Sequence, residues 1–135
     1  MSEQSSYRNT TRGITVTAVP HYLADQSDPA QSRFVWAYTI HIRNDGPVTV
    51  QLLNRHWHIT DAAGRARDVR GPGVIGEQPI LAPGEEFEYT SGVPLTTASG
   101  IMEGEYEMVL ESGAKFEVLI PAFSLDSPVG SSRPN

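Results

Sequence analysis

The stretch FVWAYTIHIR, residues 34–43, is the clearest β-strand in the sequence. Its large apolar side chains all fall on one parity, at Phe34, Trp36, Tyr38, Ile40 and Ile42. Successive side chains of a strand point to opposite faces, so this alternation predicts a strand with one face buried in a core. A turn of sequence NDGP follows directly after Arg43.

The same period of two continues on both sides of this strand, and no segment shows a sustained helical period. An earlier strand is expected from Ile14 to about Leu23. A later strand begins at Val48, and its apolar residues change parity between Leu52 and Leu53. A slip of one residue inverts the buried face, so we expect a β-bulge near Leu52–Asn54. With further short strands near 67–70, 87–89, 102–110 and 116–120, about seven strands predict an all-β chain folded as an antiparallel β-sandwich.

The 135 residues suit one domain, which we place at 13–126, between a flexible leader (1–12) and a flexible tail (127–135). The chain has no cysteine, which excludes disulfides, thiol nucleophiles and thiolate metal sites. The polar N-terminus lacks the apolar core of a signal peptide, and no apolar run is long enough to span a bilayer. We therefore expect a cytoplasmic protein without membrane insertion.

Charge is unevenly distributed along the chain. Residues 1–80 hold eight arginines and seven acidic residues, a net charge of +1. Residues 81–135 hold two basic and nine acidic residues, a net charge of −7. Nucleic-acid binding requires a broad positive surface, so a chain with a total charge of −6 is not expected to bind nucleic acid.

The stretch NRHWHITDAAGRARDVRGPGVIGEQP, residues 54–79, holds the glycine motif of the chain, at Gly71, Gly73 and Gly76. A dinucleotide-binding fingerprint needs a helix to open at its third glycine, and Pro79 prevents a helix there. Two interpretations remain. The glycines either serve a tight crossover between strands, or their amides form a nest for an anion beside the nearby arginines. The residues we expect to bind a ligand or partner are Arg55, His56, Arg70, Gly71, Gly73, Gly76 and Gln78.

His56 and His58 form a second candidate site, since residues i and i+2 of a strand share one face. A metal site needs a third protein ligand, and strand pairing places His41 too far away to supply it. The pair is therefore a weak metal candidate. The other interpretation is two solvated imidazoles flanking a buried Trp57.

Glutamates alternate with apolar residues on two later strands, at Glu86, Glu88, Glu103, Glu105 and Glu107. Clustered carboxylates suit hard cations such as Mg²⁺. Alternating glutamates also keep the outer face of a sheet solvated, and without a calcium-loop pattern this second interpretation is favoured. No catalytic constellation is present in the sequence, so we expect neither an enzyme nor a cofactor.

Several longer motifs carry a family resemblance that extends over about residues 14–126. They are SDP (27–29), TVQL (49–52), RHW (55–57), ITD (59–61), VRGPGVIGEQP (69–79), YTSG (89–92), GEYEM (104–108) and IPAF (120–123). In these segments the chain resembles the ApaG family, and Pro72 occupies one of the family's variable positions. The resemblance implies a fibronectin type III-like, immunoglobulin-like sandwich.

The resemblance also implies several functions. Bacterial ApaG proteins are linked to cobalt and magnesium resistance or efflux, and the family's glycine motif has been suggested to bind nucleotide pyrophosphate. In eukaryotes the same domain serves as a protein-interaction module. Three hypotheses follow for this chain. It is a non-enzymatic domain that contacts a protein partner or a small anionic ligand, or a direct Co²⁺- or Mg²⁺-binding protein, or a protein that binds nucleotide pyrophosphate or diadenosine polyphosphate through the Gly71–Gly76 loop. A nucleotide-phosphate enzyme is the least favoured form of the third hypothesis. Pairing of edge strands also makes a homodimer plausible.

Overall fold

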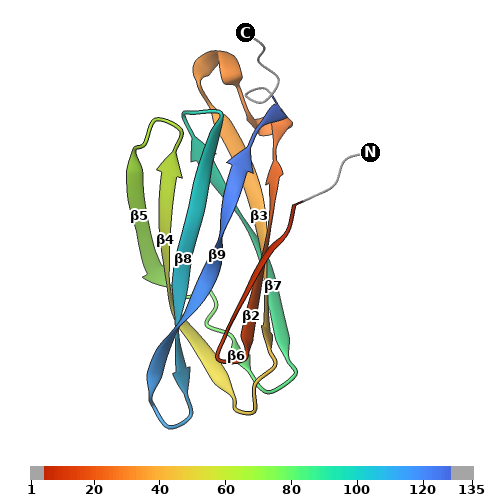
Figure 1. The fold of residues 1–135 in the computed structure, drawn as a ribbon, viewed down its shortest axis with the longest axis vertical. Helices are drawn as coiled ribbons and strands as arrows, with labels where there is room; N and C mark the ends of the chain where they lie inside the picture. The colour runs from red at the N-terminus through yellow and green to blue at the C-terminus, as the bar shows by residue number, and fades with distance from the viewer. Residues whose placement is uncertain (1–4, 129–135) are drawn as a thin grey trace.

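A computed structural model describes residues 5–128 as two packed β-sheets (Figure 1). Within these residues lie nine strands and two short 3₁₀ helices. The strands are β1 (Tyr7–Thr11), β2 (Ile14–Tyr22), β3 (Phe34–Asn44), β4 (Val50–Asp61), β5 (Ala66–Pro72), β6 (Ile80–Leu81), β7 (Glu86–Leu95), β8 (Ser99–Leu110) and β9 (Lys115–Asp126), and the helices are η1 (Ala24–Gln26) and η2 (Pro29–Gln31). The predicted antiparallel β-sandwich is confirmed.

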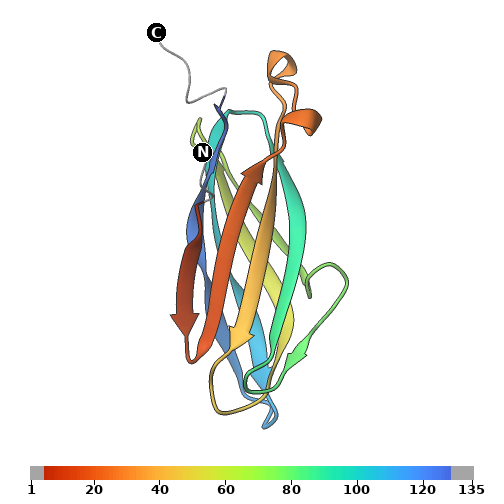
Figure 2. The same cartoon turned by 90° about the vertical axis from the view of Figure 1, so that its right-hand side faces the viewer.

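The edge strands of the two sheets meet differently on the two sides of the sandwich. One sheet has the order β1-β2-β3-β7, and the other has β5-β4-β8-β9 with β6 paired to β4. On one side β1 meets β9, where the Leu119 amide donates to Thr11 Oγ1 and the ring of Tyr7 lies 6.2 Å from that of Phe123. On the other side lie the edge strands β5 and β7, which no ladder joins. Figure 2 shows the two layers from the side.

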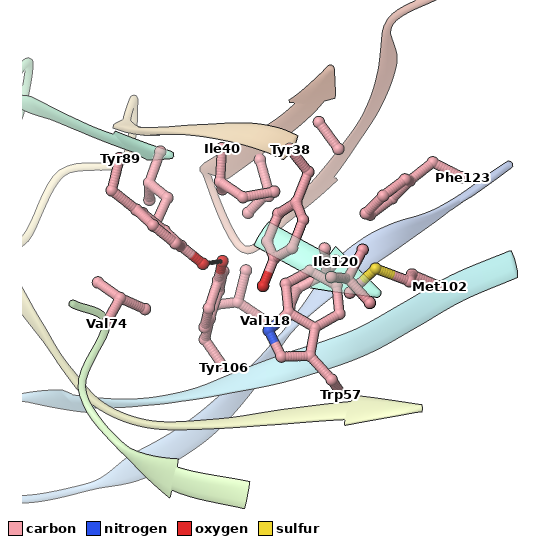
Figure 3. Close-up of a cluster of buried hydrophobic side chains, with 14 of the residues drawn as sticks. Tyr38, Ile40, Trp57, Val74, Tyr89, Met102, Tyr106, Val118, Ile120 and Phe123 are labelled. Atoms are coloured by element: carbon pink, nitrogen blue, oxygen red, sulfur yellow. Dashed lines mark hydrogen bonds between the residues drawn. The ribbon is translucent and has the colours of Figure 1, made fainter. Parts of the chain in front are cut away.

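The core lies between the sheets and contains the face predicted from β3. Phe34, Trp36, Tyr38, Ile40 and Ile42 are all buried. Both tryptophans of the chain belong to this one core. The aromatic rings of Tyr38 and Trp57 lie 5.2 Å apart in an edge-to-face arrangement with an interplanar angle of 68°, and this contact joins β3 to β4 across the sandwich (Figure 3).

The predicted β-bulge is confirmed, because the pairing of β4 with β8 shifts between Leu52 and Asn54. Leu52 is buried before the shift, and Trp57 and Ile59 are buried after it. The bulge turns His56 and His58 toward the outer face of their sheet. Strands β3 and β4 lie in opposite sheets, so their outward side chains diverge.

Two sequence predictions need correction. The leader expected over residues 1–12 contains β1, and β1 with β6 raises the number of strands above the expected seven. The polar sequence YRNTT of β1 has no apolar alternation, and β6 has only two residues, so neither produces the pattern of a strand.

Of the tail expected over 127–135, only Ser127 and Pro128 lie within the described residues. Ser127 is buried, and its amide donates to the Ala98 carbonyl. No helix within residues 5–128 is long and apolar enough to cross a membrane.

Candidate metal centre and glycine loop

Two histidines and two carboxylates gather on the outer face of the sheet β5-β4-β8-β9. His56 and His58 stand on β4, with ring centroids 4.1 Å apart. Asp68 lies opposite His58 on β5, and Glu105 lies opposite His56 on β8. We call these four residues the histidine–carboxylate cluster. It combines three strands, and therefore three separate parts of the sequence.

The two carboxylates face opposite sides of the histidine pair. Toward β8, His56 Nδ1 donates to Glu105 Oε2 at 2.7 Å, and His58 Nε2 lies 3.6 Å from Glu105 Oε1. Toward β5, His58 Nδ1 donates to Asp68 Oδ1 at 3.0 Å, and His56 Nε2 lies 3.7 Å from Asp68 Oδ2. Each ring thus presents one nitrogen to each carboxylate.

Backbone features of β4 and β8 place His56 beside Glu105. A Cβ added to Gly104 would lie 2.1 Å from the His56 carbonyl oxygen, so only glycine permits this close approach of β8 to β4. The ladder between β8 and β9 also shifts between Met102 and Gly104. Register shifts change the direction in which the following side chains point. One shift, at Leu52–Asn54, precedes the two histidines on β4, and the other, at Met102–Gly104, precedes Glu105 on β8.

The β4–β5 turn places Asp68 beside His58. Asp61 Oδ1 accepts hydrogen bonds from the amides of Ala63 and Arg65, which fixes the turn and the register after it. The hydrogen bond from His58 lowers the pKa of the Asp68 carboxyl. Asp68 is therefore held ionised, in the form that binds a cation.

On the β5 side, His56, His58 and Asp68 each offer one donor atom, and these atoms lie within 4.8 Å of one another. His56 Nε2 is buried and has no hydrogen-bond partner among the described residues. A buried polar atom without a partner costs free energy unless something binds it. Ligands of a tetrahedral site lie about 3.4 Å apart, so a bound ion would draw the half-exposed Asp68 inward.

Among the other glutamates, Glu103 lies on β8 opposite His58 and borders the cluster. His41 pairs with Glu86 on the sheet β1-β2-β3-β7, and Arg43 Nη1 is 3.6 Å from the same carboxylate. The glutamates predicted on two later strands lie in different sheets: Glu86 and Glu88 are on β7, with Glu88 opposite His41, and Glu103, Glu105 and Glu107 are on β8. On β8, Glu107 accepts a hydrogen bond from Asn54 at 2.6 Å.

The glycine motif forms a tight two-residue turn between Val74 and Glu77. The Val74 amide donates to Glu77 O at 2.8 Å, and the Glu77 amide donates back to Val74 O at 2.9 Å. Ile75 (φ 43°) and Gly76 (φ 80°) both have positive φ, as a type I′ turn requires. The Gly73 amide donates to Leu53 O, and a Cβ on Gly73 would lie 2.3 Å from Glu77 O. These three amides are therefore used within the chain, and nucleotide binding by this loop remains a prediction.

The other predicted site residues divide into two groups. Arg55 Nη1 donates to the carbonyls of Pro72 and Gly73, and Gln78 Nε2 donates to Leu53 O, so both hold the glycine loop. Gly71 lies against the Arg55 guanidinium. Arg70 is exposed opposite His56 and lines, with Glu105, a cavity of about 430 Å³ beside the cluster.

The sequence alone did not connect Asp68 or Glu105 with the histidine pair. The position of Asp68 could have been predicted from the sequence, because a hairpin centred on Ala63 places residue 68 opposite residue 58. The position of Glu105 could not, because it depends on the pairing of β4 with the distant β8.

Similar proteins identify the family. A family model described as the ApaG domain matches residues 24–110. A protein named ApaG from Rhodospirillum centenum is 64% identical over 129 residues, which are 96% of this chain and 99% of that protein. Its counterpart in Paramagnetospirillum magneticum is 60% identical over the same shares of the two chains. A crystal structure of an ApaA protein from Bordetella pertussis, 52% identical, superposes with a TM-score of 0.83 over 85% of this chain and 94% of that one. This chain therefore belongs to the ApaG family.

Proposed function

We propose that this protein is a non-enzymatic binding protein that holds a divalent transition-metal ion, with Co²⁺ as the representative ion, at the histidine–carboxylate cluster. The observation that supports this most strongly is the buried His56 Nε2, which lacks a hydrogen-bond partner among the described residues and lies 3.7 Å from Asp68 Oδ2. This proposal gives a direct physical basis to the link with cobalt that the family resemblance implies.

The proposed ligands are His56 Nε2, His58 Nδ1 and an oxygen of Asp68. Glu105 would remain outside the first shell, hydrogen-bonded to the opposite nitrogens of the two rings. A carboxylate in that position fixes the tautomer of a ligating histidine and increases its basicity. His58 would give up its present hydrogen bond to Asp68 when the ion binds, and both groups would then contact the ion.

The donor set also discriminates between ions. Two imidazole nitrogens and one carboxylate suit Co²⁺, Ni²⁺ and Zn²⁺. Mg²⁺ requires oxygen ligands in near-ideal octahedral geometry and keeps much of its water. The same site would therefore bind Co²⁺ in preference to Mg²⁺, and an effect on magnesium would have to be indirect.

Calorimetric titration of the purified protein with CoCl₂ and with MgCl₂ tests this proposal. We expect heat from Co²⁺ with a stoichiometry near one, and none from Mg²⁺. His56→Ala/His58→Ala should abolish the heat, because two of three ligands are lost. Glu105→Gln should lower the affinity for Co²⁺ about tenfold or more, which is the usual effect of removing the hydrogen-bond partner of a ligating histidine.

His21→Ala/His41→Ala provides the matched control, because it removes the same number of imidazoles from the other sheet. This variant should bind Co²⁺ like the wild type. Equal heats from the two double variants, or no heat from the wild type, would rule out the cluster as the cobalt site.

A protein-interaction function at the glycine loop is a second candidate, supported by exposed apolar side chains. Ile75 is 57% exposed at the turn and Ile80 is 62% exposed on β6. A photo-crosslinking amino acid at position 75 should give a discrete adduct in cells, whereas one at Ser112, in the β8–β9 turn, should not. Identical adducts from both positions, or none, would remove this candidate.

A further inference from the structure

A groove lined by three arginines lies on the side of the sandwich where β5 and β7 form the sheet edges. Arg33 precedes β3, Arg65 lies in the β4–β5 turn, and Arg67 is on β5. Together with Ile59, Pro94 and Leu95 they line a hollow of about 520 Å³. Figure 1 shows the parts that contribute, the η1–η2 loop and the β4–β5 turn, at the same end of the molecule.

The charge of this arginine groove contrasts with the rest of the protein. Three of the ten basic residues line it, although the chain carries a net charge of −6. Its one acidic group is already used, because Asp61 Oδ2 accepts from Arg65 Nε at 2.9 Å. Thr96 Oγ1 accepts a second hydrogen bond, from Arg65 Nη2, so the Arg65 side chain is held in place along one side of the groove.

The other two guanidinium groups retain unused hydrogen-bond donors. Arg67 Nη2 makes a single long bond of 3.4 Å to the Pro94 carbonyl. The Arg33 side chain has no hydrogen-bond or ion-pair partner within residues 5–128. Guanidinium groups bind planar and tetrahedral oxyanions through two parallel hydrogen bonds, which makes them preferred receptors for carboxylate and phosphate.

The walls of the groove determine what kind of anion fits. Pro94 supplies exposed apolar surface beside the guanidinium groups, and the largely buried side chains of Ile59 and Leu95 also line the groove. Addition of a peptide strand is disfavoured, because Pro94 on the β7 edge has no N–H to donate, and charged residues on β5 oppose edge pairing. A small ligand that combines an oxyanion with an apolar body matches both features.

We propose that the arginine groove binds a small organic oxyanion, with its carboxylate or phosphate on Arg33 and Arg67 and its apolar part against Ile59, Pro94 and Leu95. This site is separate from the cluster. Arg67 and Asp68 are adjacent residues of β5, so their side chains point to opposite faces of the sheet. The site is also separate from the glycine loop.

Amide chemical shifts measured by NMR test this proposal with phenyl phosphate, benzoate and the neutral benzamide as probes. A chelator in every sample removes divalent ions, so the outcome does not depend on the metal site. We expect phenyl phosphate or benzoate to shift the amides of Ser32, Ala66 and Leu95 at about millimolar concentration. Whichever of these two probes binds more tightly shows whether the site prefers a phosphate or a carboxylate.

Two double variants with the same change in net charge provide the comparison. Arg33→Ala/Arg67→Ala should weaken binding about tenfold or more, because two charge-assisted contacts are lost. Arg8→Ala/Lys115→Ala removes two positive charges from exposed positions on β1 and β9 and should bind like the wild type. Equal weakening in both, equal binding of benzamide, or no shift with either anion would overturn the proposal.

Discussion

Ile75 occupies a backbone conformation that is costly for its side chain. A β-branched residue rarely adopts positive φ, and the φ of Ile75 is 43° while its side chain is 57% exposed. Neither burial nor a favourable backbone explains isoleucine here, which is consistent with a role in recognition.

Replacing Ile75 with asparagine should stabilise the protein by about 1 kcal/mol, because an Asn-Gly pair is preferred in a type I′ turn and tolerates positive φ. Urea denaturation measures the free energy of unfolding. Ile80→Asn is the control, since it removes a comparably exposed isoleucine from a strand where no such strain exists. If Ile75→Asn is no more stable than this control, the strain at Ile75 has been misjudged.

Gly104 determines how closely β8 approaches β4 at the metal centre. Gly104→Ala should lower the free energy of unfolding by about 1–3 kcal/mol, as other overpacked sites do, and should weaken Co²⁺ binding by displacing Glu105. Gly92→Ala is a matched strand substitution whose added Cβ meets nothing closer than 3.5 Å. Chemical denaturation and cobalt titration of both variants should separate them, and similar results for the two would contradict this role of Gly104.

At the scale of the strands, the alternation of apolar and polar residues in the sequence was enough to predict the buried face of β3 and the bulge in β4. Apolar alternation reports directly which face is buried, and Phe34 and Ile42 illustrate this. The same signal is absent from β1, whose polar residues pair with β2. For the metal centre, local hairpin symmetry could have located Asp68, whereas Glu105 required the non-local pairing of β4 with β8.

A buried hydrogen bond between two tyrosines connects a strand of one sheet to a strand of the other. Tyr89 on β7 and Tyr106 on β8 are 2.6 Å apart at their hydroxyl oxygens (Figure 3). Tyr106→Phe should destabilise the protein by about 1–2 kcal/mol, since it leaves a buried hydroxyl without its partner. The double variant with Tyr89→Phe should cost less than the sum of the single variants. A thermodynamic cycle from urea denaturation measures this coupling, and strict additivity would show that the bond contributes nothing.

For the whole molecule, the buried tyrosines predict how stability changes at high pH. Burial raises the pKa of both Tyr89 and Tyr106 above the ordinary tyrosine value of about 10. The unfolded chain therefore loses these protons at lower pH than the folded chain does. Their contribution to stability is complete below pH 10.0 and is lost as the pH rises toward the folded-state pKa values.

Absorbance at the tyrosinate band during alkaline titration should show the buried tyrosines ionising together with unfolding. The variant Tyr89→Phe/Tyr106→Phe should lose less stability than the wild type over the same pH range. Ionisation of all five tyrosines near pH 10 in the native protein would contradict the burial of this pair.

The central claim is that His56, His58 and Asp68 hold a transition-metal ion. An anomalous difference map at the cobalt absorption edge, from a crystal grown with CoCl₂, tests it most directly. We expect one strong peak on the outer face of the sheet, about 2.1 Å from His56 Nε2 and within bonding distance of His58 and Asp68. A fully occupied peak elsewhere, beside His41 and Glu86 for example, or no peak in a crystal that contains cobalt, would contradict the account.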